Sequence, residues 1–341
     1  MGERIIRNFM IVILAVLLAY GQAAAQESFF KGKTVRIVVG FAAGGGFDTY
    51  SRAMARYWGR HIPGNPSIMV ENMAGAGSLI AANHVYNAAR PDGLTIGNFG
   101  GGLFMQQLKG GAGIEFDARK FEFLGVPVQD NRSCAFTKAS GITSMERWMA
   151  AKSPVKIGAT APGDLVHDGP KILQAALGLP IHLVSGYKGT ADIRLAAEAG
   201  ELAGGCWGWD SIKATWARAL ESGDAIVVVQ MVSKPHPDLP KVPLAISYAK
   251  SEDARQLIEA GVTIPAITNR PYVVRPGTPK DRVEMLRKAF DATMKDPEFV
   301  ADAKKSRIDL EPIGGLEVQK MVGDMFNLSP ALIAKLRDAL K

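Results

Sequence analysis

The stretch TVRIVVGFAAGGGFDTY, residues 34–50, is the most informative part of this chain for its fold class. It opens with a β-branched run at residues 35–39, of the kind that is buried in a parallel sheet. Three glycines follow at 44–46, and a helical pattern begins near Asp48. A strand, a glycine loop and a helix start can present unpaired backbone N–H groups to an anion. The same pattern fits a tight turn whose glycines only let the helix pack on the strand, and this stretch alone leaves both interpretations open.

The N-terminus has the features of a secretory signal peptide. Arg4 and Arg7 precede an apolar run at residues 9–20, and small residues end at Ala25. As a helix this run reaches only ~18 Å, short of the roughly 30 Å core of a bilayer. We therefore predict cleavage after Ala25 and a soluble protein in the bacterial periplasm.

The rest of the chain, residues 26–341, is long enough for two domains. Strand-like runs at 35–39, 67–70 and 94–98 each lead through a loop into a helical segment. This repetition predicts an α/β fold with a mostly parallel sheet. The net charge of +7 is spread along the chain without a basic block, so nucleic acid is not an expected partner.

Signals for catalysis or metal binding are weak. The sequence has neither G-x-S-x-G nor G-x-x-x-x-G-K-[ST], and its five histidines lack the spacing of paired metal ligands. The adjacent His167 and Asp168 fit a surface helix pair better than a site. We predict no catalytic residue, no metal and no cofactor.

The only two cysteines, Cys134 and Cys206, lie in strand-like segments. An oxidising compartment would allow a disulfide if those strands were close neighbours. Two buried free thiols are the alternative that the sequence favours, but the pairing stays open.

Five short motifs occur in one order over essentially the whole mature chain. Together they resemble the receptor proteins of tripartite tricarboxylate transporters, the Bug/TctC family of periplasmic solute-binding proteins. The motifs are VRIVVGFAAGGGFD at 35–48, VENMAGAGS at 70–78, ARPDGLTI at 89–96, GYKGT at 186–190 and RPGTP at 275–279.

The resemblance implies a type II periplasmic-binding-protein fold, with two α/β domains and a ligand cleft between them. The implied first domain spans residues 26–128 and 241–341, and the second spans 129–240. The resemblance also implies a monomeric receptor without enzyme activity. Its ligand would be a small organic acid: a di- or tricarboxylate, an acidic amino acid or an aromatic acid. Its partner would be a two-subunit membrane permease, with a sensor kinase as the alternative and a periplasmic hydrolase as a weaker one.

By resemblance, four loops supply the binding site, and backbone N–H groups in such loops can hold a carboxylate without an arginine. The implied ligand-binding residues are Phe41, Ala42, Ala43, Gly44, Gly45, Gly46 and Asp48; Gly75, Ala76 and Gly77; Thr160, Ala161, Pro162 and Gly163; Tyr187, Lys188, Gly189 and Thr190; and Trp209.

Several of these residues also fit structural roles. Asp48 fits a helix cap as well as a ligand contact, and Tyr187 and Thr190 fit turn and cap positions. Core or hinge packing suits Trp207 and Trp209 better than stacking on a ligand. The segment ATAPGD at 159–164 offers one hydroxyl where the family carries several, so the family's ligands do not transfer directly to this chain.

Overall fold

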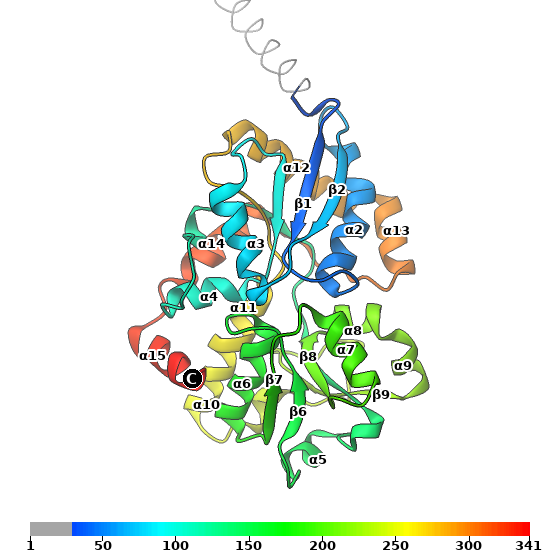
Figure 1. The fold of residues 1–341 in the computed structure, drawn as a ribbon, viewed down its shortest axis with the longest axis vertical. Helices are drawn as coiled ribbons and strands as arrows, with labels where there is room; N and C mark the ends of the chain where they lie inside the picture. The colour runs from blue at the N-terminus through cyan, green and yellow to red at the C-terminus, as the bar shows by residue number, and fades with distance from the viewer. Residues whose placement is uncertain (1–28) are drawn as a thin grey trace, which may run out of the picture.

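The computed structural model describes residues 29–341, and the predicted signal peptide at residues 1–25 lies outside the described residues. Two lobes, each built on its own sheet, stack along the long axis of the molecule (Figure 1). No helix within residues 29–341 is both long and apolar enough to cross a membrane.

The first sheet is mixed and has the strand order β11-β4-β10-β3-β1-β2. β1 pairs in parallel with β2 and β3, whereas β10 and β11 run antiparallel to β4. Its parallel part is thus the repeated strand–loop–helix segment predicted from the sequence. The strands are β1 (Thr34–Val39), β2 (Ser67–Asn72), β3 (Thr95–Asn98), β4 (Glu122–Val126), β10 (Tyr272–Val274) and β11 (Ile313–Gly314).

Both faces of the first sheet are buried. Ile37 and Val39 of β1 pack in one core with Trp58, and Val38 packs in the opposite core with Phe99. This alternation is what a strand between two helical layers requires. The helices of this lobe are α2 (Gly46–Trp58), α3 (Leu79–Asn83), α4 (Gly102–Leu108), α12 (Lys280–Lys295), α13 (Pro297–Lys305) and α14 (Gly315–Met325).

The second sheet has the order β7-β6-β8-β5-β9. β6 is parallel to β7 and β8, and β5 is antiparallel to β8 and β9. The strands are β5 (Arg132–Thr137), β6 (Val155–Gly158), β7 (Ile181–Val184), β8 (Gly204–Gly208) and β9 (Ala225–Gln230). The accompanying helices are α5 (Met145–Met149), α6 (Leu165–Leu177), α7 (Thr190–Glu198), α8 (Trp209–Thr215), α9 (Ala217–Ser222), α10 (Glu252–Ile258), α11 (Ile264–Ile267) and α15 (Pro330–Ala339).

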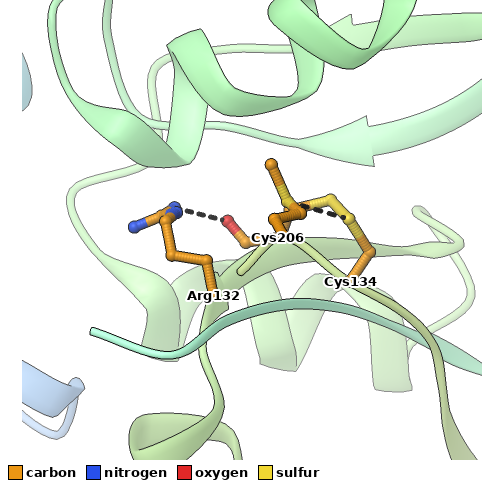
Figure 2. The surroundings of a disulfide bond; sticks show 4 residues. Arg132, Cys134 and Cys206 are labelled. Carbon is orange, nitrogen blue, oxygen red and sulfur yellow. Dashed lines mark hydrogen bonds between the residues drawn. A yellow bond between two sulfur atoms is a disulfide. The ribbon is translucent and has the colours of Figure 1, made fainter. Parts of the chain in front are cut away.

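A disulfide joins the two cysteines, which answers the question that the sequence left open. Cys134 of β5 lies directly opposite Cys206 of β8, and both are fully buried. Figure 2 shows the bridge beside Arg132, whose Nη2 donates to the carbonyl oxygen of Cys206 at 2.9 Å. Met231 Sδ lies 3.6 Å from Cys134 Sγ.

Trp216 interrupts the helical stretch between residues 209 and 222. Its backbone leaves helical geometry, and its ring stacks on Trp207 with centroids 5.8 Å apart. The stretch therefore forms two short helices, α8 and α9.

Helices that the sequence did not reveal tie the lobes together. After α14 has packed on the first sheet, α15 places Leu336 in the core of the second lobe. Ile258 and Val262, which precede β10, lie in that same core. The division at residues 128 and 241 stays a prediction.

Candidate functional site

Loops from both lobes meet at one place, where adjacent parallel strands end. β1 and β2 lead into the loops at residues 40–45 and 73–78, and β6 and β7 lead into those at 159–164 and 185–189. The carboxyl ends of parallel strands are where open α/β sheets place ligand sites. The Ala42 N–H donates to the carbonyl oxygen of Lys188 at 3.0 Å, so the lobes are in direct contact here.

A cavity of about 60 Å³ lies between these loops. A water needs about 10–15 Å³ of such volume, so the cavity as it stands has room for a few waters or a small polar group, and a larger ligand requires the lobes to separate. Eight residues of the implied site line it: Phe41, Gly75, Ala76, Gly77, Thr160, Ala161, Tyr187 and Lys188. Ser78 and Gly186 complete the lining.

One wall of the cavity is made of unusual backbone. Gly75, Ala76, Gly77 and Ser78 have φ angles of 145°, 47°, 60° and 74°. Left-handed conformations at non-glycine residues such as Ala76 and Ser78 cost about 1–3 kcal/mol each and gather at functional sites. The Gly100 N–H donates to Ser78 Oγ at 2.9 Å, which holds this wall against the loop after β3.

Behind the opposite wall lies a buried acid that the implied site did not include. Thr160 Oγ1 donates to Asp164 Oδ2, and the Asp164 side chain is almost completely buried. Burial raises the pKa of the Asp164 carboxyl to about 6, although Thr160 and Arg132 act in the opposite direction. In the sequence, Asp164 stands out only as the last residue of the segment ATAPGD.

Tyr187 and Lys188 reach the cavity in different ways. Burial, together with the charges of Glu201 and Asp192, raises the pKa of Tyr187. Lys188 is exposed, and its backbone oxygen makes the contact with Ala42. The loop therefore contributes backbone as well as charge.

Asp48 stabilises the first loop from inside and does not line the cavity. Its carboxylate accepts hydrogen bonds from the Gly44 N–H at 2.9 Å, from Arg52 Nε at 2.9 Å and from Asn72 Nδ2 at 3.0 Å. Burial alone raises the pKa of Asp48, but these bonds outweigh it and hold the pKa below its usual range.

The other implied residues surround the cavity. Gly45 faces Thr190 and Gly189 faces Ala42 across the lobe contact. Pro162 and Gly163 line a neighbouring cavity of about 690 Å³. Trp209 donates through Nε1 to Asp238 Oδ2 at 3.1 Å. Ala43, Gly44 and Gly46 belong to the same first loop and the start of α2 and are not part of the lining.

The signals for the missed lining residues were weak. Ser78 closes the motif VENMAGAGS, but its contact with Gly100 depends on tertiary structure. Gly186 opens the motif GYKGT, yet nothing in that motif separates a lining glycine from a turn glycine.

A separate acidic group, His236, Asp238 and Asp309, has side chains close enough together to suggest a metal site. Lys213 Nζ already lies 2.7 Å from Asp238 Oδ2 and 2.7 Å from Asp309 Oδ1. The lysine ammonium supplies the cation that these carboxylates need, and the arrangement is an ion pair network.

Comparison with known proteins agrees with the two-lobed fold. No protein family model matches the chain. It is 25% identical over 331 residues to the "UPF0065 protein in gbd 5'region" of Cupriavidus necator, covering 94% of this chain and 93% of that protein. The structure of the periplasmic binding protein BugD superposes with a TM-score of 0.75 at 21% identity, covering 91% of this chain and 98% of BugD. The resemblance to the Bug/TctC family is confirmed.

MatC of Rhodopseudomonas palustris, solved with bound malate, gives a TM-score of 0.71 at 19% identity and covers 92% of this chain and 100% of MatC. The predicted Bug/TctC fold, with two α/β domains, is therefore the fold of this chain.

Proposed function

We propose that the chain is a periplasmic solute-binding receptor that captures a small organic carboxylate between its lobes. The observation that carries this proposal is the cavity between Phe41, the strained wall at residues 75–78, Thr160 and Tyr187, because both lobes contribute to its lining. A ligand that contacts both lobes favours the closed form, which is how hinged binding proteins work.

The chemistry of the lining supports an acid as ligand. The loops follow strands, and loops of this kind can offer backbone N–H groups to carboxylate oxygens. Malate bound to MatC is a precedent on the same fold. We propose the lining residues, with the loops behind them, as the binding site.

The cavity supports binding better than turnover. Among the described lining residues, the Ser78 and Thr160 hydroxyls are already hydrogen-bonded, to Gly100 and Asp164. His167 is turned to Asp168, with 2.9 Å between Nδ1 and Oδ1. We further propose that the protein acts as a monomer without catalysis and delivers its ligand to a two-subunit membrane permease after export through a cleaved signal peptide.

A thermal-shift screen of organic acids tests this function. A ligand that binds only the folded state raises the melting temperature by mass action, about 2.7 kcal/mol of stabilisation at one hundred times Kd. We expect at least one mono- or dicarboxylate to do so, with calorimetry giving one site and the acid recovered unchanged. A screen without any stabilising acid, or chemical conversion of the bound acid, contradicts the proposal.

A further inference from the structure

One hydroxyl in the cavity lining, that of Thr160, already donates its proton in a hydrogen bond. Thr160 lines the cavity, and its Oγ1 donates to Asp164 Oδ2. Asp164 lies directly behind the lining, between the lobes. Its Oδ1 is 3.2 Å from the position that a Cβ on Gly100 would take, and its own Cβ is 3.1 Å from the corresponding position on Gly77.

The direction of this hydrogen bond determines what Thr160 offers a ligand. A hydroxyl has one proton to donate. While Asp164 is ionised, the Thr160 proton points at the carboxylate, so the cavity receives only oxygen lone pairs with a negative charge behind them. A protonated Asp164 can instead donate to Thr160 Oγ1, which frees the hydroxyl proton to point into the cavity.

We propose that Asp164 is a specificity residue that takes up one proton when a carboxylate occupies the cavity. This inference rests on the proposed function. It makes capture of an acid a proton-coupled event: one proton moves from solvent to Asp164, the Asp164–Thr160 hydrogen bond reverses, and Thr160 donates to the ligand.

Burial and the neighbouring charges allow the Asp164 carboxyl to take up a proton near neutral pH. Burial raises its pKa to about 6; Arg132 of β5 lowers the pKa and Asp168 of α6 raises it. Lys109 Nζ already pairs with Asp168 at 3.1 Å. The loops of the first lobe that pack on Asp164 contribute Gly77, Ser78 and Gly100, which have no titratable side chain. An anion in the cavity adds repulsion and favours the protonated acid further.

A purely structural role for Asp164 is the competing explanation, since it occupies the N-cap position of α6. Its side chain is bonded to Thr160 and has no well-aligned cap hydrogen bond, although the Val166 N–H is close enough to lower the pKa of the carboxyl. Asn caps a helix as well as Asp does, so Asp164→Asn keeps the cap while removing the charge. Its amide also donates permanently to Thr160, which reproduces the protonated state.

Titration calorimetry with malate and succinate between pH 6.5 and 8.5, in two buffers of different ionisation enthalpy, tests the proposal. Carboxyls titrate near pH 4, so both acids stay ionised in this range. For the wild type we expect uptake of about one proton at pH 8 and an affinity that falls by up to about tenfold per pH unit. Asp164→Asn should bind without proton uptake, independently of pH, and more tightly than the wild type at pH 8.

Two further variants separate the proposal from general electrostatics. Asp192→Asn removes a charge that acts on Tyr187 but has no bond to Thr160, so proton uptake should persist. Thr160→Val should weaken binding at every pH, and Thr160→Ser should restore both affinity and proton uptake.

The outcomes distinguish this inference from the receptor function. Binding without proton uptake, or an Asp164→Asn protein with wild-type pH dependence, overturns the inference and leaves the receptor function standing. If neither acid binds at any pH, the inference is overturned for these acids, and failure of the thermal-shift screen is what removes the receptor function.

Discussion

Lys109 at the end of α4 and Asp168 of α6 form an ion pair between the two lobes, with 3.1 Å between Nζ and Oδ2 and only 9% of each side chain exposed. The same carboxylate accepts the Gly163 N–H at 3.0 Å. Burial alone raises the pKa of Asp168, but bonds from His167 and attraction to Lys109 outweigh it, so the pKa lies below its usual range. The Asp168 carboxylate thus binds both Lys109 of the other lobe and the loop at Gly163 beside the cavity.

Lys109→Met should shift the protein toward an open form. Removing one partner of a buried ion pair costs about 3–5 kcal/mol, because the remaining charge is desolvated without compensation. In an open form Asp168 is hydrated again, so the variant raises the free energy of the closed form relative to the open form. We expect a larger radius of gyration in small-angle X-ray scattering and an affinity at least about tenfold weaker.

Lys335→Met is the matched control, because Lys335 pairs with Asp253 at the surface, where the two side chains are 43% and 69% exposed. Surface pairs contribute little, so radius and affinity should stay at wild-type values. A Lys109→Met protein that also matches the wild type in both measurements would show that the ion pair does not hold the lobes together.

Gly77→Ala should impair binding more than stability. Gly77 has φ +60°, and an added Cβ would stand 3.1 Å from Asp164 Cβ and 3.2 Å from the Ala161 carbonyl oxygen across the cleft. Gly178 has φ +70° and open space around it, so Gly178→Ala carries the same backbone cost of about 1–2 kcal/mol without the interlobe clash. Denaturation and calorimetry on both variants should show similar losses of stability but weaker binding only for Gly77→Ala; equal affinities would contradict close interlobe contact at this position.

Much of the cavity lining could be predicted, because short motifs define backbone loops. The glycine loop, the loop at 75–77 and Tyr187–Lys188 depend on local sequence, and the structure brings all three together. Asp164 and Lys109 could not be assigned in this way. Asp164 is buried because loops of the other lobe at Gly77 and Gly100 pack against it, and Lys109 pairs with Asp168 across the lobe contact. Helices α10 and α15 were missed for a similar reason. Their apolar residues pack in the core of the second lobe, and the local sequence pattern does not indicate with which part of the chain they pack.

Replacing both cysteines by alanine should lower the free energy of unfolding. The bridge closes a loop with a sequence separation of 72 residues, for which chain entropy predicts about 4 kcal/mol. Urea denaturation of Cys134→Ala/Cys206→Ala should show a loss of about 2–4 kcal/mol. Because both cysteines are fully buried, a reductant should have little effect until the protein unfolds. A double variant as stable as the wild type would argue for unpaired thiols.

A buried charge cluster lies where the chain crosses between lobes. Asp130 Oδ2 accepts from Arg132 Nη1 at 2.8 Å and from Asn269 Nδ2 at 2.6 Å, while Oδ1 accepts from Arg270 Nη2 at 3.1 Å. Asp210 lies 2.8 Å from Arg270, but neither of its oxygens has an aligned hydrogen bond. Burial raises the pKa of Asp210 to about 7, whereas the arginines outweigh burial at Asp130 and lower its pKa.

Asp210 should therefore make stability depend on pH. Its unfolded pKa is about 3.9, so the folded state binds the proton more tightly. Its stabilising contribution is complete below pH 4 and is lost as the pH rises to about 7. Melting curves from pH 5 to pH 8 should show the melting temperature of Asp210→Asn rising relative to that of the wild type as the pH rises. Asp130→Asn should melt below the wild type at every pH. A constant difference in melting temperature between Asp210→Asn and the wild type would contradict this assignment.

Calorimetric titration of an acid from the screen into Ala161→Trp tests most directly whether the interlobe cavity is the binding site. Ala161 lines a cavity of about 60 Å³, which an indole would fill. Ala334→Trp, on the exposed side of α15, is the control. We predict one site in the wild type and the control and none in folded Ala161→Trp. Wild-type affinity in Ala161→Trp would contradict the account, because the acid would then bind elsewhere.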